Sequence, residues 1–130
     1  MTKTHHKTGQ PVLVAIDIAK HRNEVLIAVP GRRRRKRLTV RNVREDIDRF
    51  VETLTAFGVP VQVGFEPTGD YHRPLAWRLH QAGFELKLIS SLSLARTREA
   101  MHNSWDKNDP KDAQVILHML RIGATQRYVD

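Results

Sequence analysis

The chain has 130 residues, of which 40% are hydrophobic and none is cysteine. This size and content fit one globular domain, and the lack of cysteine excludes disulfides and thiolate metal sites. The formal net charge of +8 favours a polyanionic partner, with nucleic acid as the first candidate and general solubility as the alternative. No apolar run approaches the roughly 18 residues of a membrane helix, so we expect a cytoplasmic protein with no membrane partner.

The first third of the chain reads as strands around a strongly basic segment. The apolar runs Val12–Asp17 and Glu24–Val29 predict two strands. The dipeptide "PG" then predicts a turn, and the basic run Arg32–Arg37 follows it before a short third strand at "LTV". This order predicts an antiparallel hairpin with a basic tip.

The rest of the chain alternates helices and strands. Asn42 is expected to cap the first helix, with Glu45 three residues later completing a capping box. Gly123 is placed to end the last helix. In chain order we expect a helix over residues 42–58, a strand at Val61–Glu66, a helix over residues 70–83, a strand at Glu85–Ser90, a short helix around Leu94–Met101 and a last helix ending near Ile122.

The expected order is three strands and then helices alternating with strands. It predicts an α/β fold with a mixed five-stranded sheet flanked by helices. This order resembles the ribonuclease-H-like fold. Residues 1–10 are polar and are expected to form a flexible tail, so that the domain spans residues 11–130.

Two acids stand at the ends of the most apolar strands. Asp17 follows "VLVAI", and Glu66 follows "VQVGF". If these strands are parallel neighbours, their carboxyl ends meet at one edge of the sheet and bring both carboxylates together. Two such charges repel, and an oxygen-liganded Mg²⁺ or Mn²⁺ ion would compensate them. The alternative is that each is an ordinary strand-end acid facing solvent.

The segment "NSWDKNDPKDAQVI" carries three more acids ahead of the last helix. Asp109 is suited to the N-cap position, Pro110 to the first helical position and Asp112 to the first turn, so helix capping alone explains them. Asp109 and Asp112 are also three residues apart, which puts both on one side of a helical turn. They are therefore equally candidates for a third and fourth metal-binding carboxylate, whereas Asp106 is expected to be a solvated loop residue.

The basic run is the second candidate site. Consecutive like charges are costly without an anionic partner, which favours a phosphate-contacting clamp over a solvated turn. The candidate nucleic-acid contacts in this run are Arg32, Arg33, Arg34, Arg35, Lys36 and Arg37.

Three segments, "AIDIAK", "FEPTGDYH" and "DKNDPKDAQVI", together resemble the DEDD transposases of the insertion-sequence-110 type. The family pattern has an acid in I-D-x-A-K, a glutamate in E-x-T-G-x-Y and two acids in D-x-x-D-A. The sequence departs from it in having Asn108 where threonine is frequent and Gln114 where arginine is frequent, and neither change removes a carboxylate. The residues that match the pattern are Asp17, Lys20, Glu66, Thr68, Gly69, Tyr71, Asp109, Asp112 and Ala113.

The resemblance implies a RuvC-like domain that cleaves and exchanges DNA strands. Its catalytic and metal-binding residues would be Asp17, Glu66, Asp109 and Asp112, holding two Mg²⁺ or Mn²⁺ ions, and Lys20 would join the nucleic-acid contacts. The family also implies a structured guide RNA and a dimer or tetramer of the full-length protein. Family members carry a nucleophilic serine in a second domain, which is absent here, so we expect the present chain to have weak or no strand-transfer activity alone.

Three alternatives remain open. A RuvC-type junction resolvase would use the same four carboxylates. Actin-like sugar kinases and ATPases share the fold, but they have Gly and Thr just after the first acid, where this chain has Ile18 and Ala19. A non-catalytic nucleic-acid-binding domain would use the acids only as helix caps.

Overall fold

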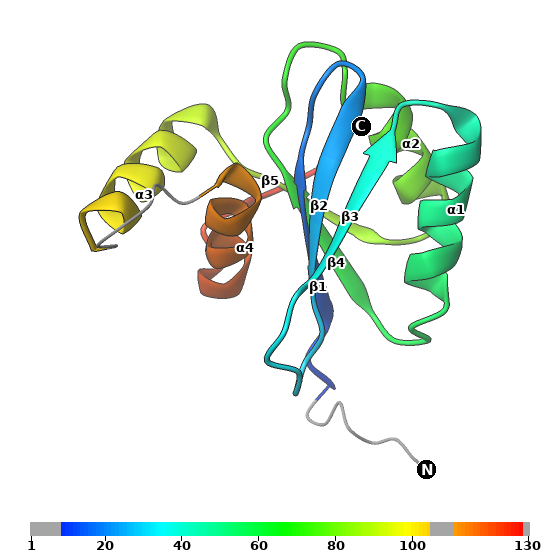
Figure 1. Cartoon of the computed structure of the whole chain (residues 1–130), viewed down its shortest axis with the longest axis horizontal. Coiled ribbons are helices and arrows are strands. Elements are labelled where there is room, and N and C mark those ends of the chain that lie inside the picture. The colour runs from blue at the N-terminus through cyan, green and yellow to red at the C-terminus, as the bar shows by residue number, and fades with distance from the viewer. Residues whose placement is uncertain (1–8, 105–110, 129–130) are drawn as a thin grey trace.

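The computed structural model describes residues 9–104 and 111–128, so almost all of the expected tail, residues 1–10, lies outside the described part. The described chain forms one sheet with helices on both faces (Figure 1). Its strands are β1 (Val12–Asp17), β2 (Arg22–Ala28), β3 (Lys36–Arg41), β4 (Val61–Phe65), β5 (Glu85–Leu88) and β6 (Gln126–Arg127). Its helices are α1 (Arg44–Thr55), α2 (Arg73–Gln81), α3 (Ser91–Ser104) and α4 (Asp112–Ile122). Within these residues, no helix has both the length and the apolar character needed to span a membrane.

The sheet is mixed, as predicted. Its strand order is β3-β2-β1-β4-β5-β6. The β1–β2 and β2–β3 pairs are antiparallel, which confirms the predicted hairpin, and the β1–β4 and β4–β5 pairs are parallel. The described sheet has six strands rather than the predicted five. The additional β6 pairs with β5 through two exposed residues, and so short a polar segment has no apolar pattern that would reveal it.

Alternation of side chains along each strand assigns the two faces of the sheet. Val14 and Ile16 of β1 belong to the core formed with α1 and α2, whereas Ala15 packs in the core formed with α3 and α4. Figure 1 shows the first helix pair on one side of the sheet and the second pair on the other. The same alternation places Asp17, two residues beyond Ala15, on the face covered by α3 and α4.

Asn42 does not cap α1, contrary to the prediction. The helix begins at Arg44 without a side-chain capping bond, so the expected capping box is not formed. The Asn42 Nδ2 atom instead donates to the carbonyl oxygens of Ala19 and Lys20, at 2.9 and 2.8 Å, and its Oδ1 accepts from Asn23 Nδ2 at 2.8 Å. Asn23 is fully buried, and a buried amide needs such partners. Tertiary contacts have therefore displaced the local cap.

A glycine in β4, Gly64, allows α4 to pack close to the sheet. A Cβ atom at Gly64 would lie only 2.7 Å from Cδ2 of Leu120. The register partner of Gly64 on β1 is Ala15, so two small residues stand side by side beneath the helix. Because α4 begins at Asp112, this seat also decides where that carboxylate lies relative to the sheet.

We predict that Gly64→Ala lowers the free energy of unfolding by about 1–3 kcal/mol, because the added methyl group overpacks the contact with Leu120. Urea unfolding at equilibrium measures this change. In a Leu120→Ala background the same substitution should cost little, since the atoms that it would meet are gone. An equal cost in both backgrounds would show that the close approach to Leu120 is not the cause.

Candidate functional site

The first two predicted acids do meet at one edge of the sheet. Parallel pairing of β1 with β4 aligns Ile16 with Phe65, so Asp17 and Glu66 are the next residues of two adjacent strands. Each lies two positions beyond a residue that packs beneath α4, and both therefore belong to the face of α3 and α4. The prediction that these strands are parallel neighbours is confirmed.

Helix α3 begins beside Glu66. The Ser91 Oγ atom, at the first position of the helix, donates a hydrogen bond to Glu66 Oε2 at 2.5 Å. The loop that follows Glu66 turns at Thr68, whose carbonyl oxygen accepts from the backbone N–H of Tyr71. The Ser91 hydroxyl thus orients the Glu66 carboxylate, and Glu66 as a whole is partly exposed.

The last helix starts later than the sequence predicts. Its first residue is Asp112 and its N-cap is Lys111, so Asp112 occupies the first helical position rather than the third, and Asp109 is not the cap of this helix. The Gln114 Oε1 atom accepts from the Lys111 backbone N–H at 2.8 Å and supplies the capping bond instead. Asp109, Pro110 and Asp106 lie outside the described residues.

Asp112 is held by an arginine of α3. Its Oδ1 atom accepts from Nε of Arg98 at 2.9 Å and lies 2.8 Å from Nη2 of the same guanidinium. Both side chains are about one-third exposed. The pair ties the start of α4 to the middle of α3, so the position of Asp112 depends on both helices.

The carboxylates share one electrostatic environment. Burial raises the pKa of Asp17 above its ordinary value, and the negative charges of Asp112, Glu24 and Glu66 raise that pKa further. The positive charge of Arg98 acts in the opposite direction. Ionisation of Asp17 is therefore less favourable in the folded protein than in the unfolded chain, and a further positive charge nearby would favour it. Across residues 9–104 and 111–128, no three acids or histidines come close enough to hold one metal ion together.

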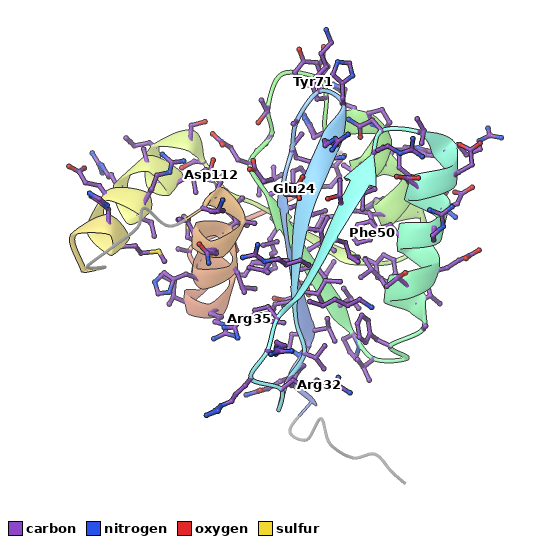
Figure 2. All side chains as sticks on the ribbon, in the orientation of Figure 1. Glu24, Arg32, Arg35, Phe50, Tyr71 and Asp112 are labelled. Carbon is purple, nitrogen blue, oxygen red and sulfur yellow. The ribbon has the colours of Figure 1, made fainter. Side chains whose placement is uncertain are left out.

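Glu24 is the member of this group that the sequence interpretation missed. It is the register partner of Asp17 across the β1–β2 pair, and its Oε1 accepts a hydrogen bond from Thr39 Oγ1 of β3 at 3.1 Å. The signal was present in the hairpin itself, because side chains of directly opposed residues project from the same face. Figure 2 shows Glu24 and Asp112 toward the same end of the molecule.

A cavity of about 200 Å³ opens between this group and the start of α4. Its charged and polar lining comes from Asp17, Glu24, Arg37, Lys111 and Gln114. It therefore holds two acids and two bases, supplied by β1, by the β2–β3 hairpin and by α4. Such a cavity can accept a ligand that carries both a phosphate group and a bound cation.

The structure divides the basic run into two parts. Arg32, Arg33 and Arg34 are exposed in the loop between β2 and β3, whereas Lys36 and Arg37 belong to β3 itself. The predicted basic tip is thus shorter than the run. Figure 2 shows Arg32 at the far end of the hairpin, away from Asp112 and Glu24. Lys20, the remaining predicted contact, is exposed in the turn that follows β1.

Asp17→Asn should stabilise the metal-free protein at neutral pH. The folded-state pKa of Asp17 lies above its unfolded value, so the wild type loses stability as pH rises through the unfolded pKa and then through the folded one. The asparagine variant escapes this loss. Its advantage in urea unfolding with EDTA should be present at pH 7 and shrink toward pH 4. Glu52→Gln, at an exposed acid of α1, is the control; an advantage independent of pH would contradict the electrostatic cause.

Arg98→Gln should raise the pKa of Asp17 further, because it removes the positive charge that opposes the rise. It should also lower the free energy of unfolding by about 1 kcal/mol or less, as expected for a partly exposed ion pair. An NMR titration of the Asp17 carboxyl carbon measures the pKa. Arg96→Gln, at an exposed residue of the same helix, is the matched control. An unchanged Asp17 pKa in Arg98→Gln would show that the charge of Arg98 does not act on Asp17.

Comparisons with known proteins show which family the chain resembles. A family model described as a transposase, of the DEDD insertion-sequence-110 type, matches residues 14–130. No curated protein matches the chain. Among solved structures, T. thermophilus RuvC in complex with a Holliday junction substrate has a TM-score of 0.57 and 16% sequence identity, covering 92% of this chain and 100% of that chain. YeaZ from Pseudomonas aeruginosa has a TM-score of 0.44 and 16% identity, covering 73% of this chain and 51% of that chain.

The likeness to RuvC confirms the ribonuclease-H-like fold expected from the order of strands and helices. The family match spans the strand-end acids and the start of the last helix in a single alignment. The chain therefore belongs to the DEDD transposases of the insertion-sequence-110 type.

Proposed function

We propose that this domain is the metal-dependent part of a DNA transposase, in which Asp17, Glu66, Asp109 and Asp112 hold divalent cations for cleavage and exchange of DNA strands. The observation that carries the proposal is the meeting of Asp17 and Glu66 at the ends of two parallel strands, within the electrostatic reach of Asp112. Membership of the transposase family supports the reaction class.

The chemistry of the donor set fits magnesium or manganese. The described members of the set offer only carboxylate oxygens, which hard cations prefer. Burial and, after it, the negative charges of neighbouring acids raise the pKa of Asp17, and a cation would relieve the repulsion among these charges. A pair of such ions, when bound, stabilises both the attacking and the leaving oxygen of a phosphodiester. The chain's own residues supply the rest: Ser91 orients Glu66, and Arg98 holds one oxygen of Asp112.

Nucleic acid is the proposed partner. T. thermophilus RuvC, which shares the fold, was solved in complex with a Holliday junction substrate, and this supports DNA as the ligand here. Lys20 and the run Arg32–Arg37 are proposed contacts, since exposed cations of this kind bind phosphates without reading sequence. A structured guide RNA, an oligomer and the serine of a second domain belong to the same proposal by family resemblance, with residues 11–130 acting as the metal-dependent domain.

Binding of Mn²⁺, used as a spectroscopic substitute for Mg²⁺, tests the metal site directly. We expect the wild type to bind Mn²⁺ and the variants Asp17→Asn and Glu66→Gln each to bind it at least about tenfold more weakly, because each loses a ligand oxygen. Electron paramagnetic resonance of free Mn²⁺ gives the affinity without any cleavage assay. Glu52→Gln is the control for loss of one distant negative charge. Unchanged affinity in both site variants would remove the metal assignment.

A further inference from the structure

The cavity beside Asp17 is lined by two cations, Arg37 and Lys111. Within the described part of the chain, the side chains of Arg37 and Lys111 make no ion pair and no hydrogen bond, although both line the cavity. Arg98, by contrast, is committed to Asp112. The two cations are thus available to an anionic ligand that enters the cavity.

The position of Arg37 in β3 explains how it reaches this place. Leu38 and Val40 pack toward α1, so Arg37 and Thr39 must face the opposite side of the sheet. Arg37 is the register partner of Leu26, which packs in the core with α4. A residue that the sequence assigns to a hairpin tip therefore lies along the body of the hairpin, next to the last helix.

A second cavity continues the same surface at the other end of α4. Its volume is about 510 Å³, and its polar lining comes from Gln10, Arg32, Gln62 and Arg121. Arg35 is partly buried, and Figure 2 shows it on the stretch of hairpin beside α4. Burial lowers the pKa of Arg121, and the positive charge of Arg35 lowers it further. An anion that binds near both side chains would relieve the repulsion between these like charges.

The helix contributes a matching polar stripe. Lys111, Gln114, His118 and Arg121 are spaced by three, four and three residues, which puts them along one side of α4. The stripe spans most of the 11-residue helix, whose length is roughly 16 Å. We use the name α4 trough for the surface between helix and hairpin that is lined by Arg32, Arg37, Lys111, Gln114 and Arg121, with Arg35 on the hairpin beside it.

We infer that the α4 trough holds the sugar-phosphate backbone of one nucleic-acid strand and leads it from the end of the hairpin to the carboxylates. The inference rests on the proposed function and sharpens it, because it divides the basic run by role. Arg35 and Arg37 contact the strand that enters the site, with Lys111 facing them from α4. Arg33 and Arg34 are exposed in the loop and line neither cavity, whereas Arg35 is partly buried and acts on Arg121, so Arg33 and Arg34 are peripheral to that strand.

Binding of a fluorescein-labelled 20-nucleotide single-stranded DNA to the full chain tests the trough, measured by anisotropy over a series of salt concentrations. Ca²⁺ replaces Mg²⁺ in one series and EDTA is present in the other. We expect Arg37→Gln/Lys111→Gln to weaken binding at least tenfold and to reduce the slope of log K against log salt by about 1.4, the value for two lost contacts with a single strand. The charge-retaining variant Arg37→Lys/Lys111→Arg should restore the slope.

Two further pairs of substitutions make the result specific. Arg44→Gln/Arg49→Gln removes the same charge from α1, on the opposite face of the sheet, and should change affinity less than threefold. Arg33→Gln/Arg34→Gln should cost clearly less affinity than the trough pair. If the loop pair costs as much as the trough pair or more, or if the trough pair costs no more than the α1 pair, the inference is wrong.

The outcome is separable from that of the metal site. A trough that fails in this assay leaves the Mn²⁺ affinities of the wild type and of Asp17→Asn unaffected. A metal site that fails leaves the ranking of the three double variants in EDTA intact, because that ranking depends only on phosphate contacts. Thermal unfolding of each variant confirms that exposed side chains, and not the fold, have been changed.

Discussion

Parallel pairing of β1 with β4 brings Asp17 and Glu66 to one edge of the sheet, where their negative charges must be held against mutual repulsion. Glu24 and Asp112 add to the repulsion. Three of these carboxylates are each fixed by a separate neighbour: Glu66 by a serine of α3, Asp112 by an arginine of α3, and Glu24 by a threonine of β3. The hydrogen bonds fix the orientation of these side chains, and strand pairing keeps Asp17, Glu24 and Glu66 close together.

Helix α4 has to arrive at this edge in the right place, and packing decides that. Ala15 and Gly64 form a flat seat that admits Leu120, so the helix lies close to the strands that carry the acids. The cap of its first turn is local to Lys111 and Gln114, whereas the pair of Asp112 with Arg98 ties that turn to α3. Small residues in the sheet, Leu120 near the end of the helix and Arg98 of α3 therefore act together to set the position of Asp112 at the start of α4.

Much of the fold follows from apolar patterns in the sequence. The runs that end at Asp17 and Glu66 are almost wholly buried as strands, and Gly123 ends α4 in the left-handed conformation, as expected. These features succeed because burial and backbone conformation act over a few neighbouring residues. The strand β6 was not predicted, because its two residues are exposed and carry no apolar pattern. It belongs to the sheet through its pairing with β5.

The details of the site depended on contacts between distant segments and were harder to predict. Asn42 is a good helix cap in isolation, but the buried amide of Asn23 competes for it successfully. The basic run looks uniform in one dimension, yet strand alternation sends Arg37 toward α4. The place of Glu24 beside the site follows only from the strand register, which puts it opposite Asp17. In each case a partner beyond the local window changed the role of the residue.

The hydrogen-bonded pair of Asn23 and Asn42 also affects which ligands the turn after Asp17 can bind. The backbone N–H of Ala19, two residues after Asp17, donates to Asn23 Oδ1 at 3.0 Å, and the carbonyl oxygens of Ala19 and Lys20 accept from Asn42. Successive free N–H groups in a turn can form a nest that binds phosphate. Here the N–H of Ala19 is taken by Asn23 and is not available to such a nest. The two asparagines therefore fix the turn that follows Asp17, while the cavity lined by Asp17 opens toward the start of α4.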